Sequence, residues 1–276
     1  MQLARLINPE GRPEPSVLLG QSYAPIPENI SWTSAISFSM QEEGRDFLLD
    51  QASSMNKTAT GSLEGAAPVA LTSAPIWGAG LNYKRHSTDL ETEQPLEGPG
   101  SYLRPGNCLI NNSGIIQIPA QSERVTAEGE LGLVLGKTAK DVPAEDWRSV
   151  VAGLTAVLDM TAEDAIRKNP RYIPWAKGFD TFCSVGPQIV TLDEFADEEI
   201  ASIKVATICD DHLVAEARVS DMKYNIGKLV AYFSAGRTLP AGTIICTGTP
   251  GATVIEPGSN VTASVSSIGQ LSHPVK

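Results

Sequence analysis

Short apolar segments recur through the chain from residue 76 onward, and turn-forming residues separate them. Each has the length of a strand and is too short for most helices. The candidate strands are Ile76–Ala79, Ile115–Ile118, Glu130–Leu135, Leu154–Met160, Gln188–Val190, Ile203–Cys209, Ile244–Thr247 and Val261–Val265. Helical patterns are few; the clearest run over 143–151 and over 225–235, where Asn225 can cap the helix and Gly236 can end it. Many short strands with few helices predict an α+β, mainly β fold with a mixed sheet that closes on itself.

Residues 1–72 differ from the rest of the chain. Prolines and glycines interrupt them often, and they offer one helical pattern, Met40–Gln51. The following stretch, 52–67, is rich in Ser, Thr, Gly and Ala, which is typical of a loop. We therefore expect a small N-terminal domain over residues 1–72 and a catalytic domain over 73–276.

Charge and motif content exclude several classes of function. The net charge is −11, and no basic cluster of the kind that binds phosphates is present, so we expect no nucleic-acid partner. Neither a Rossmann nor a P-loop glycine motif occurs. No apolar run is long enough for a membrane span, and the N-terminus lacks a signal-peptide pattern. The four cysteines are widely spaced, which favours free thiols in a reducing compartment, and we expect a cytoplasmic protein.

Three carboxylates lie on predicted strands. Glu128 and Glu130 are two residues apart at the start of a buried strand, so both point to the same side. Asp159 ends the apolar run 154–158 on a comparable strand. Buried like charges repel each other, and a hard divalent cation such as Mg²⁺ or Mn²⁺ relieves this. An edge strand with two exposed acids and a structural aspartate explains the same residues equally well.

His86 is one of three histidines in the chain. Asp89 follows it by three residues and Glu91 by five. On a helical turn the i+3 carboxylate is adjacent, so Asp89 could orient the imidazole and raise its basicity. Such a pair predicts a general base, although an isolated surface or capping histidine fits the pattern as well.

Several colinear motifs resemble those of the fumarylacetoacetate hydrolase family. They are Gly80-Leu-Asn-Tyr-Lys-Arg-His86, Glu128-Gly-Glu-Leu131, Leu158-Asp-Met-Thr-Ala162, Lys177-Gly-Phe-Asp-Thr-Phe-Cys-Ser-Val-Gly-Pro187, Ser220-Asp-Met222 and Thr247-Gly-Thr-Pro250. The resemblance covers about residues 75–275 and leaves the N-terminal region without a match. It implies a mixed β-sandwich roll that dimerises and holds Mg²⁺ or Mn²⁺. It also implies 2-oxo, 2,4-dioxo or enolic acid substrates, which the family hydrolyses, decarboxylates, tautomerises, isomerises or hydrates.

The resemblance also implies roles for individual residues. It assigns Glu128, Glu130 and Asp159 to the metal, the same carboxylates that strand geometry indicates. It assigns Lys177 to the substrate or to positive charge near the metal, although this lysine alone resembles a surface residue.

Three further residues are candidates for binding the substrate. Thr249, in the turn 248–250, could contact its carboxylate, although a plain tight turn explains the motif equally well. Arg104 lies where the family often has a basic residue and could be a second anion contact. Tyr83 could line the pocket or simply pack.

The chain departs from the family's pattern at three positions. Glu163 stands where the family commonly has arginine, and Ile166 where it commonly has glutamine. In hydrolytic and decarboxylating members those two groups resemble donors to developing negative charge, and losing one such donor costs about 10²–10³ in rate. Glu163 could also serve the N-terminus of a short helix. Asp89 stands where acylpyruvase-like members usually have glutamate.

From this resemblance we expect a Mg²⁺- or Mn²⁺-dependent enzyme that binds a small anionic oxo-acid and hydrolyses a C–C bond through an enolate. Isomerisation or tautomerisation is the close alternative because it needs fewer oxyanion donors, and decarboxylation of an oxaloacetate-like acid is another. A catalytically reduced member with a binding or assembly role also remains open. The resemblance further implies a homodimer.

Overall fold

The computed structural model describes residues 1–84 and 93–276. Its strands are Gln2–Ile7 (β1), Pro13–Leu19 (β2), Ser22–Pro25 (β3), Ile76–Gly80 (β4), Gly100–Arg104 (β5), Val125–Leu135 (β6), Val151–Ala162 (β7), Cys183–Thr191 (β8), Lys204–Cys209 (β9), His212–Arg218 (β10), Ile244–Cys246 (β11), Ala252–Ile255 (β12), Asn260–Val265 (β13) and Gly269–Pro274 (β14). Its α-helices are Trp32–Phe38 (α1), Glu42–Ser54 (α2), Glu163–Lys168 (α4), Ile173–Ala176 (α5), Asp197–Ser202 (α6) and Ile226–Ser234 (α7).

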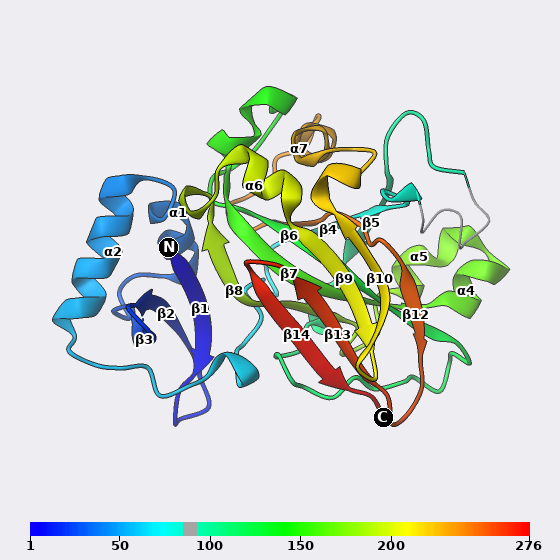
Figure 1. Ribbon diagram of the computed structural model, residues 1–276, viewed down its shortest axis with the longest axis horizontal. Coiled ribbons are helices and arrows are strands. Elements are labelled where there is room, and N and C mark those ends of the chain that lie inside the picture. Colours follow the sequence, from blue (N-terminus) through cyan, green and yellow to red (C-terminus); the bar gives the residue numbers. More distant parts are fainter. Residues whose placement is uncertain (85–92) are drawn as a thin grey trace.

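Two sheets form the molecule, and the smaller one lies in front of the centre of the larger one in Figure 1. Within the described residues the larger sheet has ten strands in the order β3-β2-β1-β8-β7-β6-β11-β4-β5, with β12 paired to β6. The smaller sheet has the order β10-β9-β13-β14. Because β11 and β4 are parallel and the other paired strands are antiparallel, the larger sheet is mixed. The predicted fold, α+β and mainly β, is confirmed.

Strands β6 and β7 lie at the centre of the larger sheet and are buried almost throughout. At Gly129, β6 lies close against the smaller sheet. A Cβ at this position would lie 2.4 Å from the carbonyl oxygen of Ala206 on β9, and the Gly129 amide donates to Thr207 Oγ1 over 2.9 Å. Only glycine fits between the two glutamates, because any side chain would push the sheets apart.

Strand β6 changes its partner along its length. Residues 125–128 pair with β12, whereas residues 132–134 pair with β11. The connection between β11 and β12, residues 247–251, therefore passes beside Glu128 and Glu130. The Gly248 amide donates to the Glu130 carboxylate over 2.8 Å. The pairing on this side of β6 is thus interrupted between Glu128 and Gly132, where Glu130 lies.

The N-terminal region extends the larger sheet, because β1 pairs with β8 and β2 and β3 continue outward from β1. Helix α2 confirms the helix predicted over 40–51, with slightly later bounds. Figure 1 shows α1 and α2 beside these strands. Within this region, Trp32 Nε1 donates to the carbonyl of Val69 over 2.8 Å and ties α1 to the segment that precedes β4. The domain boundary near residue 72 stays a prediction.

Two sequence expectations are wrong in detail. Residues 115–118 form no strand, and Ile116 makes only an isolated bridge to Val275. Gly114 and Pro119 confine this segment to a length too short for a ladder. Residues 143–151 form a 3₁₀ helix, Ala144–Ser149, instead of an α-helix. In contrast, α7 begins after its cap Asn225 and ends before Gly236, as predicted.

All four cysteines are free, as expected from their spacing. Among residues 1–84 and 93–276, no helix has both the length and the hydropathy needed to cross a bilayer.

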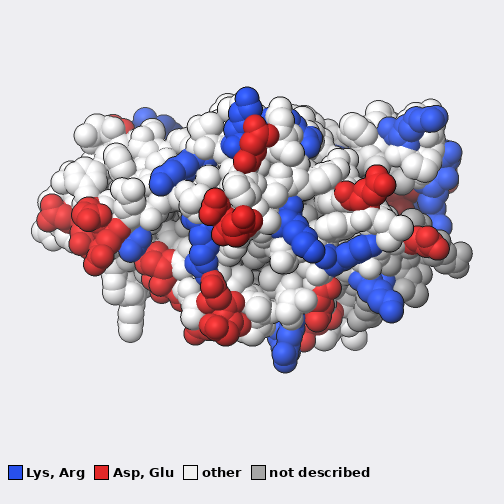
Figure 2. All heavy atoms as spheres, turned by 90° about the horizontal axis from the view of Figure 1, so that it is seen from above, with Lys and Arg blue, Asp and Glu red and all other residues white. Residues whose placement is uncertain are grey.

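The two ends of the molecule differ in charge on the face seen in Figure 2. Acidic side chains gather at the end that carries α2, and basic side chains at the end that carries α4. Glu42 and Glu43 lie in the first turn of α2, and Arg167 and Lys168 in the last turn of α4. Helix α4 directly follows β7, so the basic end is the one next to Asp159.

Candidate metal centre

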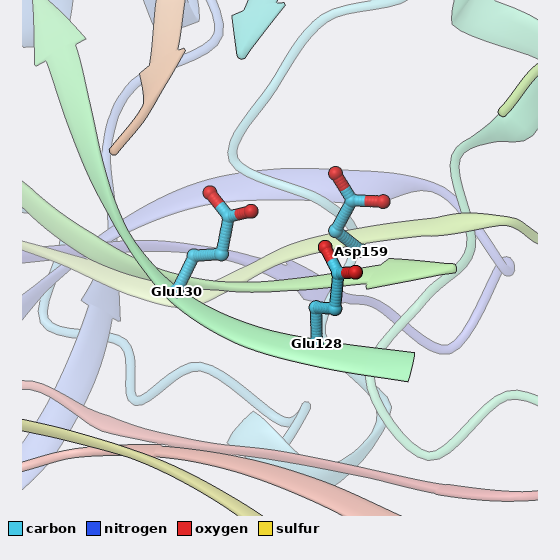
Figure 3. A group of neighbouring side chains, drawn as sticks. All are labelled: Glu128, Glu130 and Asp159. Carbon is cyan, nitrogen blue, oxygen red and sulfur yellow. The ribbon is translucent and has the colours of Figure 1, made fainter. Parts of the chain in front are cut away.

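Glu128, Glu130 and Asp159 converge on one space. Glu128 lies directly opposite Asp159 in the antiparallel ladder of β6 and β7, and Glu130 lies two residues farther along β6 on the same face. One carboxylate oxygen from each residue lies within 4.8 Å of the others. Figure 3 shows the three carboxyl groups on the same side of the two strands. The predicted convergence is observed, and the use of these residues as metal ligands stays a prediction.

Asp159 is fully buried and has three partners. Its Oδ1 accepts from Lys177 Nζ over 2.6 Å and also from Arg104 Nη2, while its Oδ2 accepts from the Tyr102 hydroxyl. Burial alone would raise the pKa of Asp159. The two cations and the phenol outweigh burial and hold this pKa below its ordinary value. Asp159 is therefore ionised at neutral pH.

Glu130 is buried as deeply as Asp159 but has weaker support. Its carboxylate accepts from the Gly248 amide, and Lys177 is the cation that favours its charged form. Burial, followed by the negative charges of Asp159 and Glu128, raises the pKa of Glu130 well above its ordinary value. Among residues 1–84 and 93–276, two cations, Lys177 and Arg104, form ion pairs with the cluster of three carboxylates.

Lys177, one of the two cations that contact Asp159, is almost completely buried. Besides Asp159, its ammonium donates to Thr161 Oγ1 over 2.7 Å and lies 3.8 Å from Glu128 Oε2. It follows α5, which places it over the end of β7. The structure therefore contradicts the surface interpretation of Lys177 and brings it to the three carboxylates.

These residues fit a hard divalent cation. All three acids offer oxygen ligands, which suit Mg²⁺ and Mn²⁺. Burial and the neighbouring carboxylates Asp159 and Glu128 raise the pKa of Glu130, and a cation bound between the three acids would offset their repulsion. Glu128 is partly exposed, so one side of the cluster is open to solvent.

The same face of β6 and β7 continues away from the carboxylates. Thr126 lies opposite Thr161, and the next pair is Arg124 and Glu163, whose backbones are joined by a 2.9 Å hydrogen bond. The Glu163 carboxylate accepts from Arg124 and, over 2.8 Å, from Arg167 Nη2 one turn along α4.

Glu163 is therefore held as an ionised acceptor. Burial alone would raise its pKa, but the bonds from Arg167 and Arg124 lower it below the ordinary value. At the other departure from the family pattern, Ile166 packs against the hydrophobic core.

Three predicted substrate contacts lie in different surroundings. Arg104 is enclosed; it donates to Asp159 and to the carbonyls of Lys177, Phe182 and Met160. Any effect of Arg104 on a ligand would therefore act through Asp159. The Thr249 hydroxyl is buried and bonds to Gly251 within its own turn.

Tyr83 is buried, and its hydroxyl has no hydrogen-bond partner among the described residues. Burial, with smaller effects from Glu130 and Asp221, raises the pKa of this phenol. His86, Asp89 and Glu91, the predicted base and its carboxylates, lie outside the described residues.

Two residues at the site were not predicted to act there. Tyr102 donates to Asp159, although in the sequence it appears only as a neighbour of Arg104 in a short motif. Asn82 is fully buried and joins its own segment to Tyr224 and Thr247. Its amide nitrogen donates to the carbonyls of Tyr224 and Thr247, and its oxygen accepts from the Tyr224 amide over 2.8 Å. The signal in the sequence is an asparagine directly after a predicted strand, within a motif that resembles the family's.

Comparison with known proteins gives consistent matches. The fumarylacetoacetate (FAA) hydrolase C-terminal family pattern matches residues 75–276. Oxaloacetate decarboxylase, mitochondrial, of Dictyostelium discoideum is 31% identical over 203 residues, which covers 71% of this chain and 91% of that protein.

Solved structures also match this chain over its whole length, and two of them are an isomerase and a hydrolase. The 5-carboxymethyl-2-hydroxymuconate delta-isomerase of Mycobacterium smegmatis has a TM-score of 0.76 at 30% identity, with all of this chain and 98% of that chain covered. Maleylpyruvate hydrolase of Sphingobium sp. SYK-6, in complex with manganese (II) ion and pyruvate, has a TM-score of 0.78 at 26% identity, with all of this chain and 98% of that chain covered.

Proposed function

The chain belongs to the fumarylacetoacetate hydrolase family, and from this premise we propose that it is a Mg²⁺- or Mn²⁺-dependent enzyme acting on a small 2-oxo or 1,3-dicarbonyl acid. The observation that carries the proposal is the cluster of Glu128, Glu130 and Asp159, whose oxygens lie within 4.8 Å of one another. These three residues would hold the ion. When bound, the ion supplies Lewis acidity that favours the enolate form of an oxo-acid.

Lys177 supplies positive charge to the same place. Its ammonium lies between Asp159 and Thr161 and is nearly buried, so its charge acts at low local dielectric. We propose that it stabilises negative charge on the substrate.

The general base remains His86, oriented by Asp89, as the sequence predicts. It would take a proton from water in hydrolysis, or from carbon in tautomerisation, a contribution of roughly 10²–10⁴-fold. Its placement is untested because both residues lie outside the described part of the chain.

Hydrolysis of an acylpyruvate-like C–C bond is the first reaction that we propose. The whole-chain match to a hydrolase that is named for maleylpyruvate and was solved with manganese and pyruvate supports it. We also expect a homodimer, as the family resemblance implies.

Isomerisation or tautomerisation is the second candidate, and Glu163 favours it. This carboxylate accepts from two arginines and cannot donate to a developing oxyanion. The 30% identity to a delta-isomerase supports the same choice. Decarboxylation, the activity named for the Dictyostelium relative, is a third outcome of the same enolate chemistry.

A screen with oxaloacetate, acetylpyruvate and fumarylpyruvate tests the proposal. Each acid is incubated with the protein and Mg²⁺ or Mn²⁺, and both enol absorbance and cleavage products are followed. We expect turnover that EDTA abolishes and that Lys177→Met lowers strongly. Absence of turnover together with absence of metal binding would instead favour a catalytically reduced member.

A further inference from the structure

Strand β5 contributes two buried side chains that contact Asp159, although β5 is the last strand of the larger sheet and lies four places from β7. The sheet must curl for these contacts to form. Resting on the proposed metal site, we propose that Tyr102 and Arg104 are positioning residues that hold the Asp159 carboxylate in one orientation and leave it a single acceptor site for a divalent cation.

Side chains alternate between the two faces of β5, which explains why Tyr102 and Arg104 act together. Tyr102 and Arg104 are two residues apart and buried, whereas Ser101 and Leu103 between and beside them are exposed. Both side chains therefore leave the strand on the same side and reach the same carboxylate. Arg104 also donates to the carbonyls of Met160 and Phe182, which fixes it to the ends of β7 and β8.

The bonds from Tyr102 and Arg104 limit the number of acceptor sites that the Asp159 carboxylate can offer to a ligand. An ionised carboxylate offers about four such sites, two on each oxygen. Arg104 and Lys177 use those of Oδ1, and the Tyr102 hydroxyl uses one of Oδ2. Among the residues that the structure describes, nothing else donates to Oδ2, so Asp159 can give a cation one oxygen without losing one of these partners.

The space for Tyr102 is built into the neighbouring strand. Gly78 on β4 lies opposite Tyr102, and a Cβ there would lie 1.9 Å from Cζ of the phenol ring. The ring also lies under the Lys177 ammonium, 4.5 Å from its centroid, which is a favourable cation–π distance. Tyr102 thus contacts both partners of the ion pair, the Asp159 carboxylate and the Lys177 ammonium.

Removing only the hydroxyl of Tyr102 tests the inference. Tyr102→Phe keeps the ring that supports Lys177 but frees Oδ2 of Asp159. We expect the Kd for Mn²⁺, measured by isothermal titration calorimetry and by electron paramagnetic resonance of free Mn²⁺, to rise about 10–100-fold. Gly78→Ala, which displaces the same ring, should weaken binding at least as much.

Tyr23→Phe is the matched control. Tyr23 lies on β3, at the opposite edge of the sheet, and its hydroxyl donates to Gln188, so this variant also loses one tyrosine hydrogen bond. We expect both Tyr→Phe variants to lose a similar amount of thermal stability in EDTA. The Kd for Mn²⁺ should stay unchanged in Tyr23→Phe and rise in Tyr102→Phe.

A Kd of Tyr102→Phe within about twofold of wild type, far below the usual effect of losing a partner of a ligand, would overturn the inference while leaving the metal site intact. An equal rise in the Kd of Tyr23→Phe would overturn it as well, because the effect would then be general loosening. Failure of the wild-type protein to bind Mn²⁺ would remove the proposed function and the inference together.

Discussion

Glu130 and Asp159 share one buried space, yet their pKa values move in opposite directions. Two cations and a phenol keep the pKa of Asp159 low, whereas burial and the neighbouring acids raise the pKa of Glu130 well above its usual range. The fold therefore stabilises the charge of one carboxylate and leaves the other in an unfavourable environment. Glu130 is the residue at which metal binding and folding stability oppose each other.

We predict that Glu130→Gln stabilises the metal-free protein and abolishes tight Mn²⁺ binding. Glutamine can still accept from the Gly248 amide, but it carries no buried charge. The gain in the free energy of unfolding at neutral pH, measured by urea denaturation in EDTA, should be on the order of 1–3 kcal/mol.

The pH dependence of this gain has a defined sign. Because folding raises the pKa of Glu130, its contribution to stability is present at low pH and is lost as pH rises through the folded pKa. The advantage of the variant should therefore disappear on acidification. Glu128→Gln is the control: this carboxylate is partly exposed, so it should lose metal affinity with little gain in stability. A metal-free Glu130→Gln protein less stable than wild type would contradict the prediction.

Arg104→Met should destabilise the fold strongly. It leaves the buried Asp159 carboxylate without its guanidinium partner, a situation that typically costs about 3–5 kcal/mol. Urea denaturation measures the effect. Arg5→Met is the comparison, because the Arg5 guanidinium donates to the carbonyls of Pro68 and Ala70 and its loss strands no bonded carboxylate. Equal losses for the two variants would show that the charge of Asp159 is not what Arg104 stabilises.

The sequence predicted those parts of the site that depend on local periodicity. Glu128 and Glu130 share a face because strand side chains alternate, and Asp159 ends a strand with the same apolar pattern. The contact of Tyr102 with Asp159 could not be predicted in this way. It arises from curvature accumulated over the strands between β5 and β7, which no local pattern records.

No strand was predicted from the sequence in the N-terminal region, where the structure has β1, β2 and β3, and the reason is different. Pro13 and Pro15 interrupt β2 and argued against a strand there. In the structure β3 pairs only with residues 16–19, so both prolines precede the part of β2 that has partners on both sides. Proline is tolerated at such a position because no ladder hydrogen bond is lost.

Exchanging the charges of Arg124 and Glu163 should reveal what the family's usual arginine contributes. Glu163→Arg alone places a third cation beside Arg124 and Arg167 and should lower the melting temperature. The double variant Arg124→Glu/Glu163→Arg keeps the cross-strand pair and still places an arginine at position 163. We expect it to recover stability and to raise the ratio of C–C hydrolysis to tautomerisation of acetylpyruvate. If hydrolysis does not rise in the stable double variant, the missing cation does not limit that reaction.

His273 should make the fold sensitive to mild acid independently of the metal site. It is fully buried on β14; its Nδ1 is bonded to the Gly114 carbonyl over 2.9 Å, and its Nε2 has no partner among the described residues. Burial lowers the pKa of His273 from 6.5 to about 4, so the unfolded chain takes up a proton that the folded chain does not. Stability should therefore fall by about 3 kcal/mol as pH drops from about 6.5 to about 4.

His273→Asn separates this effect from general acid denaturation, because the asparagine amide can still donate to Gly114 but does not titrate. The variant should be less stable than wild type at pH 8, since ring packing is lost, and the difference should narrow as the pH is lowered. His212→Asn, the same change at an exposed histidine, is the matched control for the loss of one imidazole. A stability difference between wild type and His273→Asn that stays constant from pH 8 to pH 4 would show that the buried imidazole is not the group whose protonation opposes folding.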